Sequence, residues 1–219
     1  MSDAREAILR RIRSALGDGN APTQTGDRQE IGREYRRTDG RAQDTLVELF
    51  CERVGDYRAE VQRIASAALE DALTAAALRS GGRRLVVPPG LPAEWRPAQL
   101  ELVPDAELTT AELDELDGVI TGCTVAIAET GTIVLTSDAH EGRRALSLVP
   151  DLHICIVQAS QIVGTVPEAL AQLAPVVSAE RRPLTFISGP SATSDIELKR
   201  VEGVHGPRKL VVFVTEESP

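Results

Sequence analysis

One segment of the sequence places a carboxylate between two short apolar runs, residues 124–128 and 132–136. Glu129 follows the first run, and a strand-end glutamate can act as a nucleophile or a general base where apolar surroundings favour its protonated form. Glu129 is therefore a candidate catalytic residue. The next three residues, Thr130, Gly131 and Thr132, are candidate ligands for an anion. A polar turn, in which threonine hydroxyls satisfy backbone groups, explains the same pattern equally well.

A second segment, residues 188–197, runs from an apolar strand through small residues towards an expected helix start. Free N–H groups and hydroxyls at such a place suit a phosphate or a carboxylate. Ser194 and Glu197 also fit a helix capping box, which accounts for both without a ligand. The candidate anion-binding residues of this segment are Gly189, Ser191, Thr193, Ser194 and Asp195.

A glycine-flanked turn at residues 203–207 contains His205. Glycine allows the backbone to approach a ligand closely, so His205 is a second candidate catalytic residue. A solvated loop histidine is the alternative interpretation.

Familiar nucleotide and hydrolase motifs are absent from the sequence. Gly17-Asp18-Gly19 follows an expected helix rather than a strand, so it is not a dinucleotide fingerprint. Neither lysine follows a glycine, which excludes a Walker phosphate loop. Gly189-Pro190-Ser191 lacks the second glycine of a hydrolase elbow, because position 193 is threonine.

No metal site is predicted. Asp138, His140 and Glu141 could share a divalent ion, but a solvated turn is the favoured interpretation, and His153 in an apolar strand is expected to be a core histidine. The three cysteines are scattered and form no Cys-x-x-Cys, so they predict neither a disulfide framework nor an iron–sulfur cluster. We expect core thiols at Cys51, Cys123 and Cys155.

Composition indicates a globular protein with one α/β domain and an appendage: 219 residues, 42% hydrophobic and 26% charged. The net charge of -9 argues against nucleic acid as a partner. No apolar run reaches the roughly 18 residues of a membrane span, and the first 20 residues lack the apolar core of a secretory signal. We therefore expect a cytoplasmic protein without a membrane span.

The elements that position these residues alternate between helix and strand. Residues 3–16 are expected to form an amphipathic arm, followed by a flexible linker, so the predicted division is 1–43 and 44–219. Helices are predicted from residue 44, at 63–80, from the Thr109 capping box and at 166–173. Apolar runs predict strands at 57–61, 84–87, 99–103, 118–121, 124–128, 132–136, 152–158, 183–188 and 210–215. This alternation predicts a largely parallel sheet covered on both faces, with a hairpin around Gly131.

Four ordered segments together resemble a known family: Glu129-Thr130-Gly131-Thr132, residues 148–153, Thr193-Ser194-Asp195-Ile196-Glu197 and Gly203-Val204-His205-Gly206-Pro207. They are similar to the LUD domain of the lactate utilization protein C (LutC/YkgG) family, over residues 44–215. The resemblance implies an α/β sandwich of the NagB/RpiA/CoA-transferase-like fold. It brings no established catalytic residues.

The resemblance also implies a function, namely participation in the oxidation of L-lactate to pyruvate. Cysteine-rich iron–sulfur subunits are the implied partners, and this chain would carry no cofactor itself. Two alternatives stay open: a stand-alone enzyme of the sugar-phosphate isomerase or acyl-CoA transfer kind that uses Glu129, or a module that binds a small carboxylate or phosphate.

Overall fold

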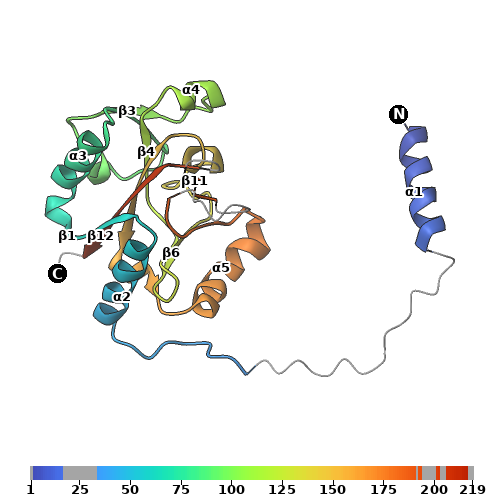
Figure 1. Ribbon diagram of the computed structural model, residues 1–219, viewed down its shortest axis with the longest axis horizontal. Coiled ribbons are helices and arrows are strands. Elements are labelled where there is room, and N and C mark those ends of the chain that lie inside the picture. The colour runs from blue at the N-terminus through green and yellow to red at the C-terminus, as the bar shows by residue number, and fades with distance from the viewer. Residues whose placement is uncertain (1, 17–33, 191, 194–200, 203–205, 217–219) are drawn as a thin grey trace. The chain divides into compact units, whose positions relative to one another are not determined.

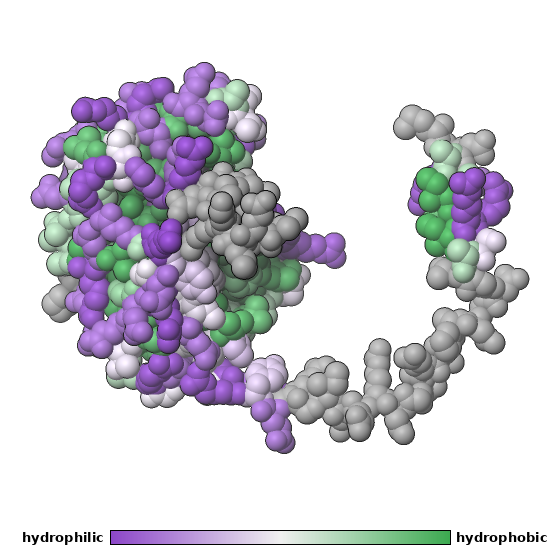
Figure 2. All heavy atoms as spheres, viewed as in Figure 1, coloured by the Kyte–Doolittle hydropathy of each residue, from purple (hydrophilic) through white to green (hydrophobic). Residues whose placement is uncertain are grey.

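The computed structural model describes residues 2–16, 34–190, 192–193, 201–202 and 206–216. The chain divides into two compact units, Met1–Tyr35 and Arg36–Pro219. The first contains the predicted amphipathic helix, α1 (Ser2–Leu16), whose apolar side chains gather on one side (Figure 2). Ile8 and Ile12 of that side are exposed. No helix among the described residues is both long and apolar enough to cross a bilayer.

The second unit alternates helices and strands along the chain. The helices are α2 (Gln43–Asp56), α3 (Leu69–Ser80), α4 (Thr110–Asp114) and α5 (Val166–Glu180). The first six strands are β1 (Glu60–Ala65), β2 (Arg84–Val87), β3 (Glu101–Pro104), β4 (Gly118–Thr121), β5 (Val125–Ile127) and β6 (Thr132–Leu135). The others are β7 (Leu152–Gln158), β8 (Ile162–Val163), β9 (Thr185–Ile187), β10 (Ala192–Thr193), β11 (Val201–Glu202) and β12 (Lys209–Glu216).

Six strands form one parallel sheet in the order β1-β12-β7-β4-β2-β3. The central strands β7 and β12 are apolar and buried almost throughout, as parallel strands covered on both faces must be. The predicted α/β class and largely parallel sheet are confirmed.

A second sheet of four strands has the order β8-β5-β6-β9. Its centre is the predicted hairpin, in which β5 and β6 pair antiparallel. Strand β9 pairs with β6 on one side and forms an edge. The sequence predicted the hairpin but not that it forms the centre of a separate sheet.

The helices and the two sheets form layers, which are identified by the side chains that they bury against each other. Helix α3 packs on one face of the six-stranded sheet through Leu73 and Ala77, against Ile154 and Phe213. Helix α2 and the four-stranded sheet share a core with the opposite face. Helix α5 covers the outer face of the smaller sheet, so that α3 and α5 lie on opposite sides of the unit (Figure 1).

Two element boundaries differ from the sequence prediction, and a third expected boundary is not described. The helix expected at 63–80 begins only at Leu69, because residues 60–65 form the half-exposed edge strand β1. Helix α5 continues beyond residue 173 and through Pro175 to Glu180. The helix start expected at Ser194 lies outside the described residues, and the adjoining β10 pairs antiparallel with β11.

The compact unit also begins earlier than the predicted boundary at residue 43. The Asp39 backbone N–H donates to Glu168 at 2.9 Å, and the Asp39 side chain is only 3% exposed. Arg36 forms an ion pair with Glu129. Residues 36–42 are therefore part of the folded unit rather than linker.

Alanine substitution should lower the free energy of unfolding much more at Gly131, in the hairpin turn, than at Gly81. Gly131 has φ +57°, and an added Cβ would lie 2.7 Å from the backbone of Arg53 and Val54 in α2. Gly81, the C-cap of α3, also has positive φ but has open space around it. Alanine at Gly81 should cost about 1 kcal/mol, for the left-handed backbone alone. Alanine at Gly131 should cost roughly 2–4 kcal/mol, because overpacking is added.

Urea unfolding of both variants measures this difference. Equal destabilisation of Gly131→Ala and Gly81→Ala would show that the turn does not pack against α2 as described.

Candidate functional site

A cavity of about 330 Å³ opens between the margins of the two sheets, and we call it the inter-sheet cavity. His153 is the second residue of β7 and Leu210 is the second residue of β12, and both line the cavity. Strand β9 borders the cavity from the smaller sheet. Its described lining residues are Arg144, Ser147, Leu148, His153, Thr185, Phe186, Ile187, Ser188, Gly189, Pro190, Gly206, Pro207 and Leu210.

Two of the four resemblance segments line this cavity. Leu148 and His153 belong to the 148–153 segment, and Gly206 and Pro207 belong to the 203–207 segment. The Glu129–Thr132 turn connects to the cavity through hydrogen bonds. The Thr193–Glu197 segment is described only for the backbone of Thr193, in β10.

A chain of hydroxyls connects the hairpin turn to the cavity. Thr130 Oγ1 and Thr132 Oγ1 lie 2.7 Å apart, and Thr132 Oγ1 lies 2.7 Å from Ser188 Oγ. Thr132 is buried, so its hydroxyl needs these partners. The hydroxyl chain therefore fixes Ser188, which lines the cavity.

Gly189 holds the next stretch of the lining close to α2. Its φ is +104°, and an added Cβ would lie 2.6 Å from Tyr57 Cβ at the C-cap of α2. Only glycine fits this close approach without a shift. The predicted anion-binding residue Gly189 thus lines the cavity and also has a packing role.

His153 is both a core residue and a cavity residue. Its Nε2 lies 2.8 Å from Thr121 Oγ1, and the residue is 1% exposed. Burial lowers the pKa of His153 to about 4, so the ring is neutral near pH 7. The sequence correctly indicated a core histidine but gave no sign of the cavity beside it.

Arg144 is the one charged residue in the described lining. It belongs to the 3-10 helix η3 (Arg144–Ser147), and its guanidinium forms no hydrogen bond or ion pair within the described part of the chain. Hydroxyls of Ser147, Thr185 and Ser188 border the same cavity. This lining is suited to a small anion. Sequence reasoning missed Arg144, because the Arg143-Arg144 pair carries no spacing signal that singles out one arginine.

Comparison with known proteins identifies the family of this chain. The LUD domain family model matches residues 94–215, more than half of the chain and all of the described residues that line the inter-sheet cavity. The chain belongs to the LUD domain family.

Relatives extend the similarity beyond the matched segment of the LUD domain. A lactate utilization protein C of Deinococcus radiodurans is 51% identical over 170 residues, 77% of this chain and 79% of the relative. The protein YkgG of Escherichia coli is 43% identical over 94 residues, 42% of this chain and 40% of YkgG. A crystal structure of a DUF162 family protein from Deinococcus radiodurans superposes with a TM-score of 0.70 at 43% identity, covering 80% of this chain and 99% of that one.

Glu129 has a different setting from the one its catalytic interpretation required. Its side chain is 49% exposed and forms an ion pair of 3.0 Å with Arg36, while its backbone N–H donates to Gly164. Glu129 does not line the inter-sheet cavity of the LUD domain. The other candidate catalytic residue, His205, lies outside the described residues, as do Ser191, Ser194 and Asp195.

Glu141 corrects the expectation of a solvated turn at residues 138–141. It is 1% exposed, and its carboxylate accepts hydrogen bonds from the Thr124 hydroxyl and from the backbone N–H groups of Thr136 and Asp138. Glu141 thereby ties the loop after β6 to the start of β5. Within the described residues, no group of histidine, cysteine or acidic side chains is arranged to hold a metal.

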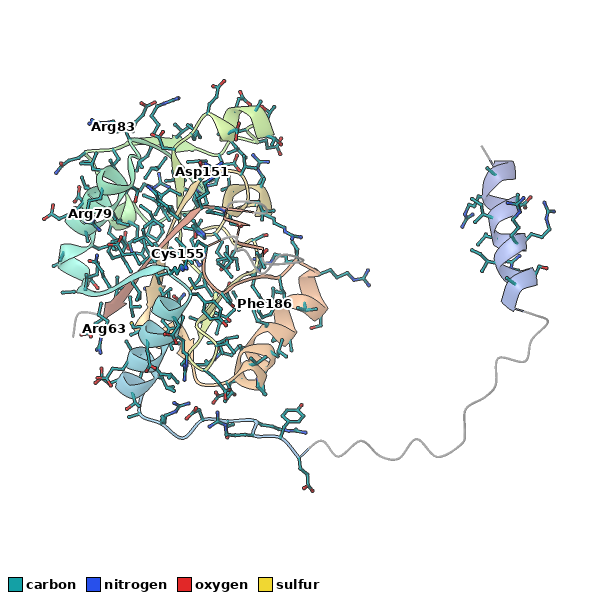
Figure 3. All side chains as sticks on the ribbon, viewed as in Figure 1. Arg63, Arg79, Arg83, Asp151, Cys155 and Phe186 are labelled. Carbon is teal, nitrogen blue, oxygen red and sulfur yellow. The ribbon has the colours of Figure 1, made fainter. Side chains whose placement is uncertain are left out.

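Cys155 lies in the interior of the LUD domain (Figure 3). Cys123 is also buried, and Cys51 is half-buried. The neighbouring thiol of Cys155 and burial raise the pKa of Cys123 well above its usual range. A protonated, enclosed thiol is a poor metal ligand. The predicted core thiols are confirmed at Cys123 and Cys155.

A second cavity of about 440 Å³ lies where β4, β7 and β12 begin. Both of its basic side chains have partners: Arg208 lies 3.4 Å from Asp151, and Lys209 Nζ donates to the backbone oxygen of Ser80 at 3.0 Å. Asp114, Glu115 and Asp117 make its lining predominantly acidic. An anion is better accommodated by the inter-sheet cavity.

Burial of His153 predicts a specific loss of stability in acid. The ordinary pKa of 6.5 applies to the unfolded chain, whereas the folded ring resists protonation down to about pH 4. The contribution of His153 to stability is therefore complete above pH 6.5 and is lost as the pH falls from 6.5 towards 4. Between pH 7 and pH 4.5 the native protein should lose about 2 kcal/mol more unfolding free energy than His153→Gln, which lacks this titration.

Chemical denaturation of the native protein and His153→Gln at several pH values tests this. Carboxylates titrate in both proteins and cancel in the difference. Parallel pH profiles would contradict a buried, neutral His153.

Proposed function

We propose that the protein is a component of an L-lactate utilisation system, in which lactate is oxidised to pyruvate. The observation that carries the proposal is the 51% identity to a lactate utilization protein C over 77% of this chain and 79% of that relative. The inter-sheet cavity supports it, because several hydroxyls and an arginine that has no partner among the described residues suit a small carboxylate.

We further propose that this chain carries no redox cofactor and acts in the cytoplasm with iron–sulfur partner subunits. An iron–sulfur cluster takes about four thiolates, and the sequence has three cysteines, of which Cys123 and Cys155 are enclosed in the core. Electrons leaving lactate would therefore pass to a partner.

A stand-alone isomerase or acyl-CoA transferase that uses Glu129 is less well supported. Such a carboxylate would need a sheltered site beside its substrate, whereas Glu129 is half-exposed and paired with Arg36. The setting of Glu129 therefore favours the role in lactate utilisation.

Deletion of the gene in its host tests the function. The deletion strain should fail to grow on L-lactate as sole carbon source and should grow normally on pyruvate, because only the step from lactate to pyruvate is blocked. A plasmid copy of the gene should restore growth on lactate. Normal growth of the deletion strain on lactate, in a host without a second copy of the gene, would refute the proposal.

Affinity purification tests the partners. The tagged full-length chain, isolated anaerobically from lactate-grown cells, should retain cysteine-rich proteins that show iron–sulfur absorption. The same tag on an unrelated acidic protein controls for non-specific capture. Recovery of the chain alone under several salt conditions would contradict the partner proposal.

A further inference from the structure

We propose that the inter-sheet cavity binds a small 2-hydroxy- or 2-oxocarboxylate, with the Arg144 guanidinium paired to the carboxylate and the His153 ring beside the 2-oxygen. The choice of this acid class among small anions rests on the proposed function. The choice of the site rests on the charges, hydroxyls and size of the cavity.

Charge is the first argument. The protein has a net charge of -9, yet the described lining of the cavity contains one arginine and no carboxylate. Arg144 is not neutralised by any described residue, in contrast to Arg208 of the other cavity, which faces Asp151. A guanidinium offers two parallel donors that match the two oxygens of a carboxylate.

Size and polarity are the second argument. A volume of about 330 Å³ is at the lower end of the range for ligand sites, which run from about 300 to 1,000 Å³. A three-carbon acid fits with several waters, since each water occupies about 30 Å³. Leu148, Ile187 and Leu210 supply apolar walls, and Ser147, Thr185 and Ser188 supply hydroxyls. This mixture of apolar walls and a few polar groups is typical of small-ligand pockets.

His153 supplies the third argument, because it has a ring nitrogen to offer. Nε2 is used in the contact with Thr121 Oγ1, so an interaction of the ring with a ligand must use Nδ1. The threonine hydroxyl can donate or accept, which allows either tautomer of the neutral ring. Nδ1 can thus accept from the hydroxyl of a 2-hydroxy acid or donate to the oxygen of a 2-oxo acid. Both redox forms of one substrate would be held by the same contacts.

Thr132 positions the lining residue Ser188 in this site. Strand β9 is an edge strand with a partner on one side only, and Ser188 follows it directly. The hydroxyl chain through Thr132 and Thr130 holds Ser188 against the end of the hairpin. The Glu129–Thr132 segment therefore acts on the cavity through Thr132 rather than through its carboxylate.

Calorimetric titration of the full-length protein tests the proposal with L-lactate, pyruvate, lactamide and inorganic phosphate as probes. L-lactate and pyruvate should each bind at one saturable site. Lactamide, which has the same shape without the charge, should bind at least about tenfold more weakly, because it lacks the charge-assisted contact. Phosphate that binds as tightly as lactate, or lactamide that binds equally well, would overturn the assignment of a carboxylate site.

Two matched variants locate the site. Arg144→Gln should reduce the affinity for L-lactate by about tenfold or more. Arg144→Lys should reduce it less, because lysine keeps the positive charge but lacks the two parallel N–H donors of the guanidinium. Arg208→Gln alters another exposed arginine, beside the other cavity, and should leave the affinity unchanged. Unchanged binding in Arg144→Gln, or an equal loss in Arg208→Gln, would refute the site.

The result is separable from the proposed function. If the protein binds none of the acids while the deletion strain fails to grow on lactate, the function stands and the cavity assignment is wrong. If it binds lactate through Arg144 while the deletion strain grows normally, the assignment stands and the function is wrong.

Discussion

The packing of the four-stranded sheet against one face of the six-stranded sheet is the interaction on which the rest of the structure depends. In β7, His153, Cys155 and Val157 face this interface, whereas Ile154 and Ile156 face α3. Apolar residues of both sheets close the interface along most of its length. The cavity opens at its margin, where the first inward residue of β7 is a histidine rather than an aliphatic residue. The site is thus a local departure from the packing rule of the core.

The same interface explains which parts of the fold could be predicted from the sequence. Strands β2, β4, β7 and β12 are buried on both faces, so each is a mostly apolar run and was predicted within a residue or two. Strand β1 lies at an edge, and its half-exposed residues lack that signal. Residues 36–42 fold against the LUD domain through Asp39 and Arg36, whose polar contacts leave no hydrophobic pattern. Helix α5 was predicted too short, because proline ordinarily disfavours helix interiors.

The candidate site could be predicted in part only. Segments with unusual glycine and hydroxyl content were recognisable, and Gly189 does line the cavity. Arg144 and Thr185 were not recognisable, because each has ordinary neighbours in the sequence and gains its place only when η3 and β9 meet across the sheet margin. His153 was assigned correctly to the core, since an apolar strand surrounds it. The sequence around a residue that both packs in the core and lines a cavity, as His153 does, indicates only that the residue is buried.

The Glu129–Thr132 turn shows how a distinctive motif can have structural causes for each of its residues. Glu129 reaches Arg36 on the surface, Gly131 allows the turn to contact α2, and Thr132 points to Ser188. Each residue fulfils a requirement of position: a surface charge, a left-handed backbone and a buried hydroxyl that needs partners. Because these requirements also fix the end of edge strand β9, the motif acts at a distance on the wall of the cavity. Chemistry at this site would then depend on the motif for the placement of Ser188, without any of its residues touching the ligand.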